Sequence, residues 1–289
     1  MTITRASFAE IIERIHTIPS LPEVVNEVCK LVNDPNANTK QLDAIIVKDA
    51  AMAAKMLRMV NSVYYGLSQP VRSLDQAIGV LGFKTIRSIA LSIGVINLFQ
   101  QQHASFNMKL FWTHSAVCAT LCRMLAQKAK LCDPELAFTV GLLKDIGKLI
   151  LVENAANETR AIVAVAREYK MPFHAAAREV IDTDDAELGA WLMQTWGLEP
   201  LLVDAVRHQY DLDAAMKKGD DLGKIVSLCI FTEYLCGLKK IKVSGDCDEP
   251  QLNPTVFNQL GLDKTALVEV LTIINDEVDR ARQLMAMAA

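Results

Sequence analysis

The sequence predicts an all-α protein, and three features of its 289 residues carry this prediction. Apolar side chains recur at intervals of three and four residues through nearly every segment, which is the period of an amphipathic helix. Glycine occurs 13 times and proline 9 times, which is below average usage. The one stretch with strand character, Lys240–Val243, has no partner strand, and one strand cannot make a sheet.

Composition limits the class of protein further. Hydrophobic residues make up 51% of the chain and the formal net charge is −4, so a globular fold is expected rather than disorder. No basic patch stands out, which argues against a nucleic-acid or membrane-surface partner. The most apolar long stretch, Ala77–Phe99, contains Lys84 and Arg87, so we expect a core helix rather than a membrane span.

The N-terminus and the cysteines predict a cytoplasmic protein. Met1–His16 is amphipathic and lacks the uninterrupted apolar segment of a signal peptide. The chain contains seven cysteines, an odd number that suits reduced thiols better than a disulfide framework. Cys118 and Cys122 share one helix face, and burial in the core is favoured over a zinc site because no partner pair follows at zinc spacing.

Helices of the first half are predicted where a capping residue or a proline precedes apolar periodicity. Ser7 is expected to cap the first helix, and Ser73 with Gln76 forms a capping-box pattern. Met52, Met56 and Met59 share one helix face, which indicates core packing or a groove for a partner. The predicted helices are Phe8–Ile15, Val24–Val32, Leu42–Ile46, Met52–Val60, Ser73–Val80 and Lys84–Gln102.

Polar residues gather at Gln100–Asn107, and we place the boundary between two packed helical subdomains, 1–105 and 106–289, in this segment. Prolines are expected at the first position of the helices that begin at Pro134 and Pro200. The predicted helices of the second half are Lys109–Lys130, Pro134–Leu143, Ile146–Val152, Glu158–Tyr169, Phe173–Ile181, Glu187–Trp196, Pro200–His208, Leu222–Leu238 and Lys264–Met285. The polar stretch Lys239–Pro254 is predicted to be a mobile loop and, near Asp246, a contact surface.

The string Gly141–Leu149 carries the strongest chemical signal. Lys144 and Asp145 interrupt an apolar helix, and an adjacent charged pair in such a run costs desolvation free energy unless it is paired. The pair lies either at a helix end whose charges reach solvent or in a polar site at a helix terminus. His114 lies inside an apolar helix and His208 closes another, and each alone is favoured as a structural residue.

Around Asp145 the pattern Leu-Leu-x-Asp-Ile-Gly-Lys resembles the core motif of the HD metal-dependent phosphohydrolase superfamily, in which a histidine precedes the aspartate and both hold a metal. More closely, the whole chain resembles an HDOD domain, the HD-related output domain of bacterial signalling proteins. The matching motifs are Ile18-Pro19-Ser20-Leu21-Pro22, Asn61-Ser62-x-Tyr64-Tyr65-Gly66, Ser73-Leu74-x-x-Ala77-Ile78-x-x-Leu81-Gly82, Trp112-x-His114, Ala137-Phe138-x-x-Gly141-Leu142-Leu143, Glu187-x-Gly189-Ala190 and Trp196-Gly197-Leu198-x-Pro200.

The resemblance implies one HDOD unit in which an N-terminal helical subdomain packs on an HD-like helical subdomain. It also implies a regulatory role, because many HDOD proteins have no known catalytic activity. We predict that one turn is structural and lies between the subdomains. Its residues are Asn61, Ser62, Tyr64, Tyr65 and Gly66.

Carried over residue by residue, the HD ligand set is vestigial. His114 matches the first ligand histidine and Asp145 matches the aspartate, but Lys144 stands where the histidine of the pair is expected. Asp185 stands where a later histidine is often found.

Towards the C-terminus the match weakens further. His208 matches the first of a frequent histidine pair, but Gln209 replaces the second. A loose alignment places Ile230 near the last aspartate of HD enzymes.

Lysine at position 144 decides which function is favoured. Its ammonium has three donors and no lone pair, so it repels the cation that a histidine would bind. It is expected instead to neutralise Asp145, with Asp185 as a second partner. We therefore expect no catalytic residue, no metal and no other cofactor in this site.

Two functions stay open at this point. The first is a bacterial regulatory protein that acts through signalling-protein partners or by sensing a ligand, without catalysis. The alternative is a divergent metal-dependent phosphohydrolase that uses His114, Asp145 and His208 with a divalent ion, and Asp185 as a further ligand. The sequence names neither the partner nor the oligomeric state.

Overall fold

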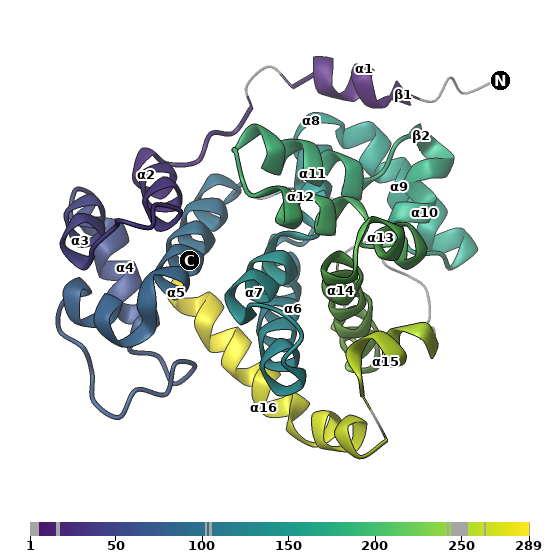
Figure 1. Cartoon of the computed structure of the whole chain (residues 1–289). Helices are drawn as coiled ribbons and strands as arrows, with labels where there is room; N and C mark the ends of the chain where they lie inside the picture. Colours follow the sequence, from purple (N-terminus) through teal and green to yellow (C-terminus); the bar gives the residue numbers. More distant parts are fainter. Residues whose placement is uncertain are drawn as a thin grey trace. The chain divides into compact units, whose positions relative to one another are not determined.

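The structure, a computed structural model, describes residues 6–15, 18–101, 103, 106–241, 243, 254–262 and 264–288 (Figure 1). It divides into a larger unit, Met1–Ile18 with Gln101–Leu271, and a smaller unit, Pro19–Gln100 with Thr272–Ala289. The internal division at Gln100–Gln101 lies within the polar segment that the sequence singles out. Each end of the chain, however, belongs to the unit formed by the opposite half, which local polarity cannot reveal because it depends on distant contacts.

Helices account for nearly all the regular structure, so the all-α prediction is confirmed. The strands among the described residues are β1 (Ala6–Ser7) and β2 (Ile181–Asp182), which pair in parallel. Ile241 and Val243 are described without strand structure, and the rest of the stretch around Asp246 lies outside the described residues.

The smaller unit contains α2 (Glu23–Val32), α3 (Thr39–Ile46), α4 (Ala50–Val60), α5 (Leu74–Leu98) and the later part of α16 (Lys264–Ala288). Helices α2, α3 and α4 each pack against α5. The side chains of Asn38, Asp49 and Ser73 cap α3, α4 and α5 by accepting a hydrogen bond from a backbone N–H three residues later.

Helix α5 is interrupted at Gly82, whose φ of 81° lies in a region that side chains disfavour. The sequence predicts two helices here, and the interruption falls between them. By length and composition α5 could cross a membrane, but 61% of its most apolar 18-residue window is buried in the protein. This burial supports the prediction of a core helix.

The methionine face of α4 belongs to the core. Met52, Met56 and Met59 are 3%, 0% and 1% exposed. The alternative of a partner groove on this face is therefore wrong, because apolar neighbours within the fold already cover it.

The turn after α4 is tied down by Asn61. Its Nδ2 donates to the carbonyl oxygens of Leu57 and Val71 at 3.0 and 2.9 Å, and its Oδ1 accepts from the Val71 N–H at 2.8 Å. The rings of Tyr64 and Tyr65 meet edge to face with centroids 4.9 Å apart. The position of this turn between the subdomains, and its importance for stability, stay predictions.

The larger unit is built around α6, which packs along α7 and α14, while α8 packs on α11. Helices α13 and α15 were not predicted; α13 is short and begins after Asp211, whose side chain caps it. The helices of this unit are α1 (Phe8–Glu13), α6 (Met108–Ala129), α7 (Pro134–Leu143), α8 (Ile146–Asn154), α9 (Ala156–Tyr169), α10 (Phe173–Val180), α11 (Asp185–Thr195), α12 (Pro200–Arg207), α13 (Leu212–Lys218), α14 (Asp220–Leu238), α15 (Pro254–Leu260) and the start of α16.

Candidate functional site

Lys144 and Asp145 lie in the link between α7 and α8, and two glycines bring other helices close to this link. A Cβ at Gly141 would lie 2.7 Å from the carbonyl oxygen of Cys118 on α6. A Cβ at Gly147 would lie 1.9 Å from the carbonyl oxygen of Asp185 on α11. Only glycine permits these approaches, so the backbone packing itself gathers polar residues of α6, α8 and α11 around Asp145.

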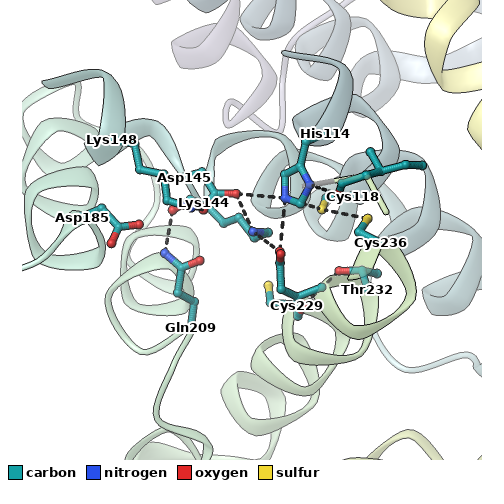
Figure 2. Close-up of polar contacts among 12 residues, drawn as sticks. His114, Cys118, Lys144, Asp145, Lys148, Asp185, Gln209, Cys229, Thr232 and Cys236 are labelled. Carbon is teal, nitrogen blue, oxygen red and sulfur yellow. Dashed lines mark hydrogen bonds and ion pairs between the residues drawn. The ribbon is translucent and has the colours of Figure 1, made fainter. Parts of the chain in front are cut away.

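Five residues form what we call the charged cluster: His114, Lys144, Asp145, Lys148 and Glu233. Figure 2 labels the first four of them. Lys144 Nζ lies 2.5 Å from Asp145 Oδ2 and 2.7 Å from Glu233 Oε2. Lys148 Nζ lies 3.0 Å from the other oxygen of Asp145. Asp145 is thus held between two ammonium groups, one of which also reaches across to α14.

His114 faces the same carboxylates from α6. Its Nδ1 lies 2.9 Å from the carbonyl oxygen of Ile241, which can only accept, so Nδ1 carries a hydrogen. Its Nε2 lies 3.2 Å from Glu233 Oε2 and 3.5 Å from Asp145 Oδ2. Cys118, one helical turn along α6, places its Sγ 3.4 Å from the same Nε2.

The cluster keeps its charges despite burial. Burial opposes ionisation of Asp145, but Lys144 and Lys148 hold its pKa well below the usual value. Asp145 and Glu233 in turn raise the pKa of Lys144, against its own desolvation. Against the same penalty, Cys118 and Glu233 raise the pKa of His114 well above its usual value. The cluster is therefore a network of ion pairs rather than a set of neutral groups.

Asp185 behaves differently on the neighbouring helix. It is 0% exposed, and burial raises its pKa to about 7. Tyr210 donates its hydroxyl hydrogen to Asp185 Oδ2 at 2.8 Å, while Oδ1 has no hydrogen-bond partner in the part of the chain that the structure describes. The expectation that Lys144 also neutralises Asp185 is not met, since Lys144 contacts Asp145 and Glu233 and the cation that acts on Asp185 is Lys148.

The HDOD domain family matches residues 18–212, more than half of the chain. The chain belongs to the HDOD family. A solved HDOD domain protein of unknown function from Geobacter sulfurreducens superposes with a TM-score of 0.82 and 21% identity, over 96% of each chain. A candidate phosphohydrolase from Shewanella amazonensis superposes with a TM-score of 0.75 and 24% identity, over 95% of this chain and 97% of its own. These likenesses show the fold of the HDOD chain.

Two further relatives are longer than this HDOD chain. A candidate signal transduction protein from Marinobacter aquaeolei has a TM-score of 0.72 and 21% identity, over 94% of this chain and 59% of its own. An uncharacterized protein from Treponema pallidum (strain Nichols) is 23% identical over 235 residues, which are 80% of this chain and 45% of that protein. The HDOD chain thus spans less than half the length of this curated relative.

The metal implied by the HD superfamily does not fit the residues of this HDOD chain. Among the described residues, His114, Asp145 and Glu233 place donor atoms within 4.8 Å of one another. The two carboxylate oxygens that face His114 are, however, the ones that Lys144 already contacts. An ammonium in that place repels a dication and occupies its ligands.

The sequence located some members of this site and missed another. His114, Lys144 and Asp145 come together as predicted, and Gln209 donates from Nε2 to the carbonyl oxygen of Lys144 at 2.6 Å. His208 belongs to neither group of potential metal donors found in the described residues, and its Nε2 is buried without a hydrogen-bond partner there. The predicted ligand set with His208 is therefore not assembled.

Glu233 is the residue that the sequence analysis missed. The loose alignment pointed to Ile230, which lies three residues before Glu233 on α14. One signal could have found Glu233, because it is the only charged residue between Lys224 and Lys239. A single carboxylate in a long apolar helix requires a cation or a route to solvent, and Glu233 has both: Lys144, and a side chain that stays 39% exposed.

A separate cavity of about 710 Å³ lies at the N-terminal end of α11. Trp191 lines it together with two arginines, each of which is paired with a carboxylate. Arg178 contacts Asp184 through Nε at 2.7 Å, and Arg207 contacts Glu187. The cavity is a place where a small ligand could meet arginines and an aromatic ring.

Proposed function

We propose that this HDOD chain is a bacterial signalling protein that acts by binding protein partners or by sensing a ligand, and that it does not hydrolyse phosphoesters. One observation carries the proposal: Lys144 Nζ lies between Asp145 Oδ2 and Glu233 Oε2, at 2.5 and 2.7 Å. The Lys144 ammonium therefore supplies the positive charge that a metal ion would supply at this point.

An ammonium in this place supplies charge but not the chemistry of hydrolysis. A catalytic metal polarises the phosphate and lowers the pKa of a bound water molecule by offering an open coordination position. Lys144 has no such position, and its hydrogens are directed to carboxylates on α14 and in the α7–α8 link. Its role in this proposal is to hold these segments together.

The direct test is hydrolysis by the full chain, purified without chelator, of a generic phosphodiester such as bis(para-nitrophenyl) phosphate, with manganese added and then removed. We expect no turnover above the rate without protein under either condition. Lys144→His returns a lone-pair donor beside Asp145 and is expected to increase manganese affinity, with Lys224→His, at a partly exposed position of α14, as the matched control. Turnover by the unmodified chain that disappears on chelation would contradict the proposal.

The same donor atoms favour a second candidate, a divergent metal-dependent phosphohydrolase. His114, Asp145 and Glu233 are grouped closely enough to share one ion. This function requires Lys144 to move away from both carboxylates. Because Lys144 and manganese compete for the same oxygens, it predicts weak manganese binding by the unmodified chain. The turnover experiment decides between the two candidates.

Partner identity is the remaining part of the proposal. We propose a cytoplasmic location and signalling proteins as partners, with no role for nucleic acid or membrane, as the acidic balance of charge suggests. Affinity capture from the native cell, using the wild-type chain and a variant with a changed α11 cavity such as Trp191→Ala, tests this part. Loss of a captured protein in the variant would assign that cavity to signalling.

A further inference from the structure

Next to the charged cluster, α6 and α14 bring buried thiols together. Cys118 and Cys236 are 0% exposed, and their Sγ atoms lie 3.7 Å apart. Cys118 Sγ also lies 3.4 Å from His114 Nε2. The sequence favoured simple burial of Cys118 and Cys122 over a zinc site, because no partner pair follows at zinc spacing. The partner is a single cysteine 118 residues further along the chain.

The distances between these donor atoms match the separations between ligand atoms in a tetrahedral zinc site. With Zn–S bonds of about 2.3 Å, two sulfur ligands of a tetrahedron lie about 3.8 Å apart, and a sulfur and an imidazole nitrogen lie about 3.6 Å apart. The observed separations are 3.7 and 3.4 Å. The donor atoms of His114, Cys118 and Cys236 all lie within 4.8 Å of one another.

We propose that His114, Cys118 and Cys236 bind a zinc ion. His114 is oriented for this role, because Nδ1 is bonded to the Ile241 carbonyl oxygen and loss of the proton from Nε2 presents a lone pair to the metal. Glu233 stays outside the ligand set, because Lys144 holds its Oε2 at 2.7 Å.

Charge favours a metal in this place. Two thiolates neutralise a dication, so Lys144 keeps Glu233 Oε2 as its partner at 2.7 Å. Asp145 keeps Lys148 as its own partner at 3.0 Å. Zinc binds two thiolates and a neutral imidazole, so the protons that these three groups carry before binding are released to solvent.

This site differs from the metal site of the HD superfamily. It shares His114 but takes sulfur from α6 and α14, and Lys144 stays on the carboxylates. The ion joins α6 to α14 through three protein ligands, and Lys144 holds the neighbouring carboxylates of Asp145 and Glu233. The inference is therefore compatible with the absence of hydrolysis but does not depend on it.

The test measures zinc and its ligands in the full chain, purified with a phosphine reductant and without chelator. We expect about one zinc per chain by elemental analysis. After exchange for cobalt, we expect a tetrahedral visible spectrum and a thiolate-to-cobalt charge-transfer band in the near ultraviolet. The charge-transfer band reports sulfur ligands directly in the unmodified protein, so this result does not depend on the folding of any variant.

Serine variants locate the ligands. Cys118→Ser and Cys236→Ser are expected to weaken zinc binding at least tenfold and to reduce the cobalt charge-transfer band. Cys122→Ser and Cys229→Ser are the matched controls, since both are buried cysteines of the same two helices and neither belongs to the donor group with His114. The controls are expected to keep zinc. Circular dichroism checks that each variant is folded.

Three outcomes would overturn the inference, and they are distinguishable. A chain that binds neither zinc nor cobalt excludes the thiol site and leaves the proposed signalling function intact. A Cys118–Cys236 disulfide found by mass spectrometry in protein prepared without reductant, together with no metal uptake after reduction, identifies a redox pair instead. Cobalt bound without the charge-transfer band places the metal on His114 and the carboxylates, which contradicts both this inference and the proposed function.

Discussion

Asp145 and Asp185 are 1% and 0% exposed on neighbouring elements of the larger unit, yet their pKa values move in opposite directions. Asp145 has an ammonium on each carboxylate oxygen and stays ionised. Asp185 has a tyrosine hydroxyl on one oxygen, and burial raises its pKa to about 7. The depth of burial is the same, so the difference teaches that the position of Lys144 and Lys148 decides which carboxylate carries charge.

The largest expected loss of stability comes from removing Lys144, one of the two cations that contact Asp145. Lys144→Met leaves Asp145 and Glu233 without their shared ammonium, and breaking such a buried pair costs about 3–5 kcal/mol. Urea denaturation at pH 7 measures the free energy of unfolding. Lys224→Met, which removes a partly exposed lysine of α14 that pairs with Asp220, is the control and should leave the midpoint nearly unchanged. Equal stability of the two variants would mean that the ion pairs of Lys144 contribute nothing.

The pH dependence of Asp185 sharpens the comparison. Its folded pKa of about 7 exceeds the value of 3.8 expected when unfolded, so the folded state binds the proton more tightly. Asp185 therefore contributes stability at low pH that is lost as the pH rises from about 4 to about 7, by up to about 4 kcal/mol. Asp185→Asn is expected to remove this loss and to be the more stable chain at pH 8.

Unfolding of Asp185→Asn and wild type between pH 4.5 and pH 8 provides the measurement. The charged groups that act on Asp185 are Lys148, Asp145 and Asp184, and none of them is changed by the substitution. Asp182→Asn, at the exposed residue of β2, is the control and should follow wild type. Parallel curves for wild type and Asp185→Asn would show that Asp185 is ionised like Asp145.

The smallest effect is expected at Asn61, which provides a reference without charge. Asn61→Leu removes three hydrogen bonds to Leu57 and Val71 at an exposed turn, so we expect a loss of about 1–2 kcal/mol and a lower melting temperature. Val63→Ala, at an exposed position of the same turn, is the control. Intact stability together with lost partner capture would assign the turn to an interface.

Local features of the fold were predictable, because they depend on residues close together in the sequence. The cap at Ser73 and the interruption of α5 between residues 80 and 84 follow from side chains and a glycine within one turn of the helix end. The charged pair Lys144–Asp145 was recognised in the same way, as a polar interruption of an apolar run.

The rest of the site depends on contacts between residues far apart. Glu233 is 89 residues from Lys144, and Cys236 is 118 residues from Cys118. The residues next to Glu233 in the sequence do not show which helix it faces, and the loose alignment pointed to Ile230 rather than to Glu233. The assignment of each chain end to the unit formed by the opposite half was also missed, because it too depends on contacts between residues far apart in the sequence.

Gly147 has a consequence for how mutational tolerance in this protein is interpreted. Any side chain at this position meets the backbone of Asp185, where even a Cβ would come within 1.9 Å of the carbonyl oxygen. Saturation mutagenesis should therefore show position 147 as intolerant under every selection that requires a folded chain. Position 144 should instead accept or reject substitutions according to charge. A mutational map with both patterns would distinguish positions where the backbone packing excludes any side chain from positions where only the charge of the side chain matters.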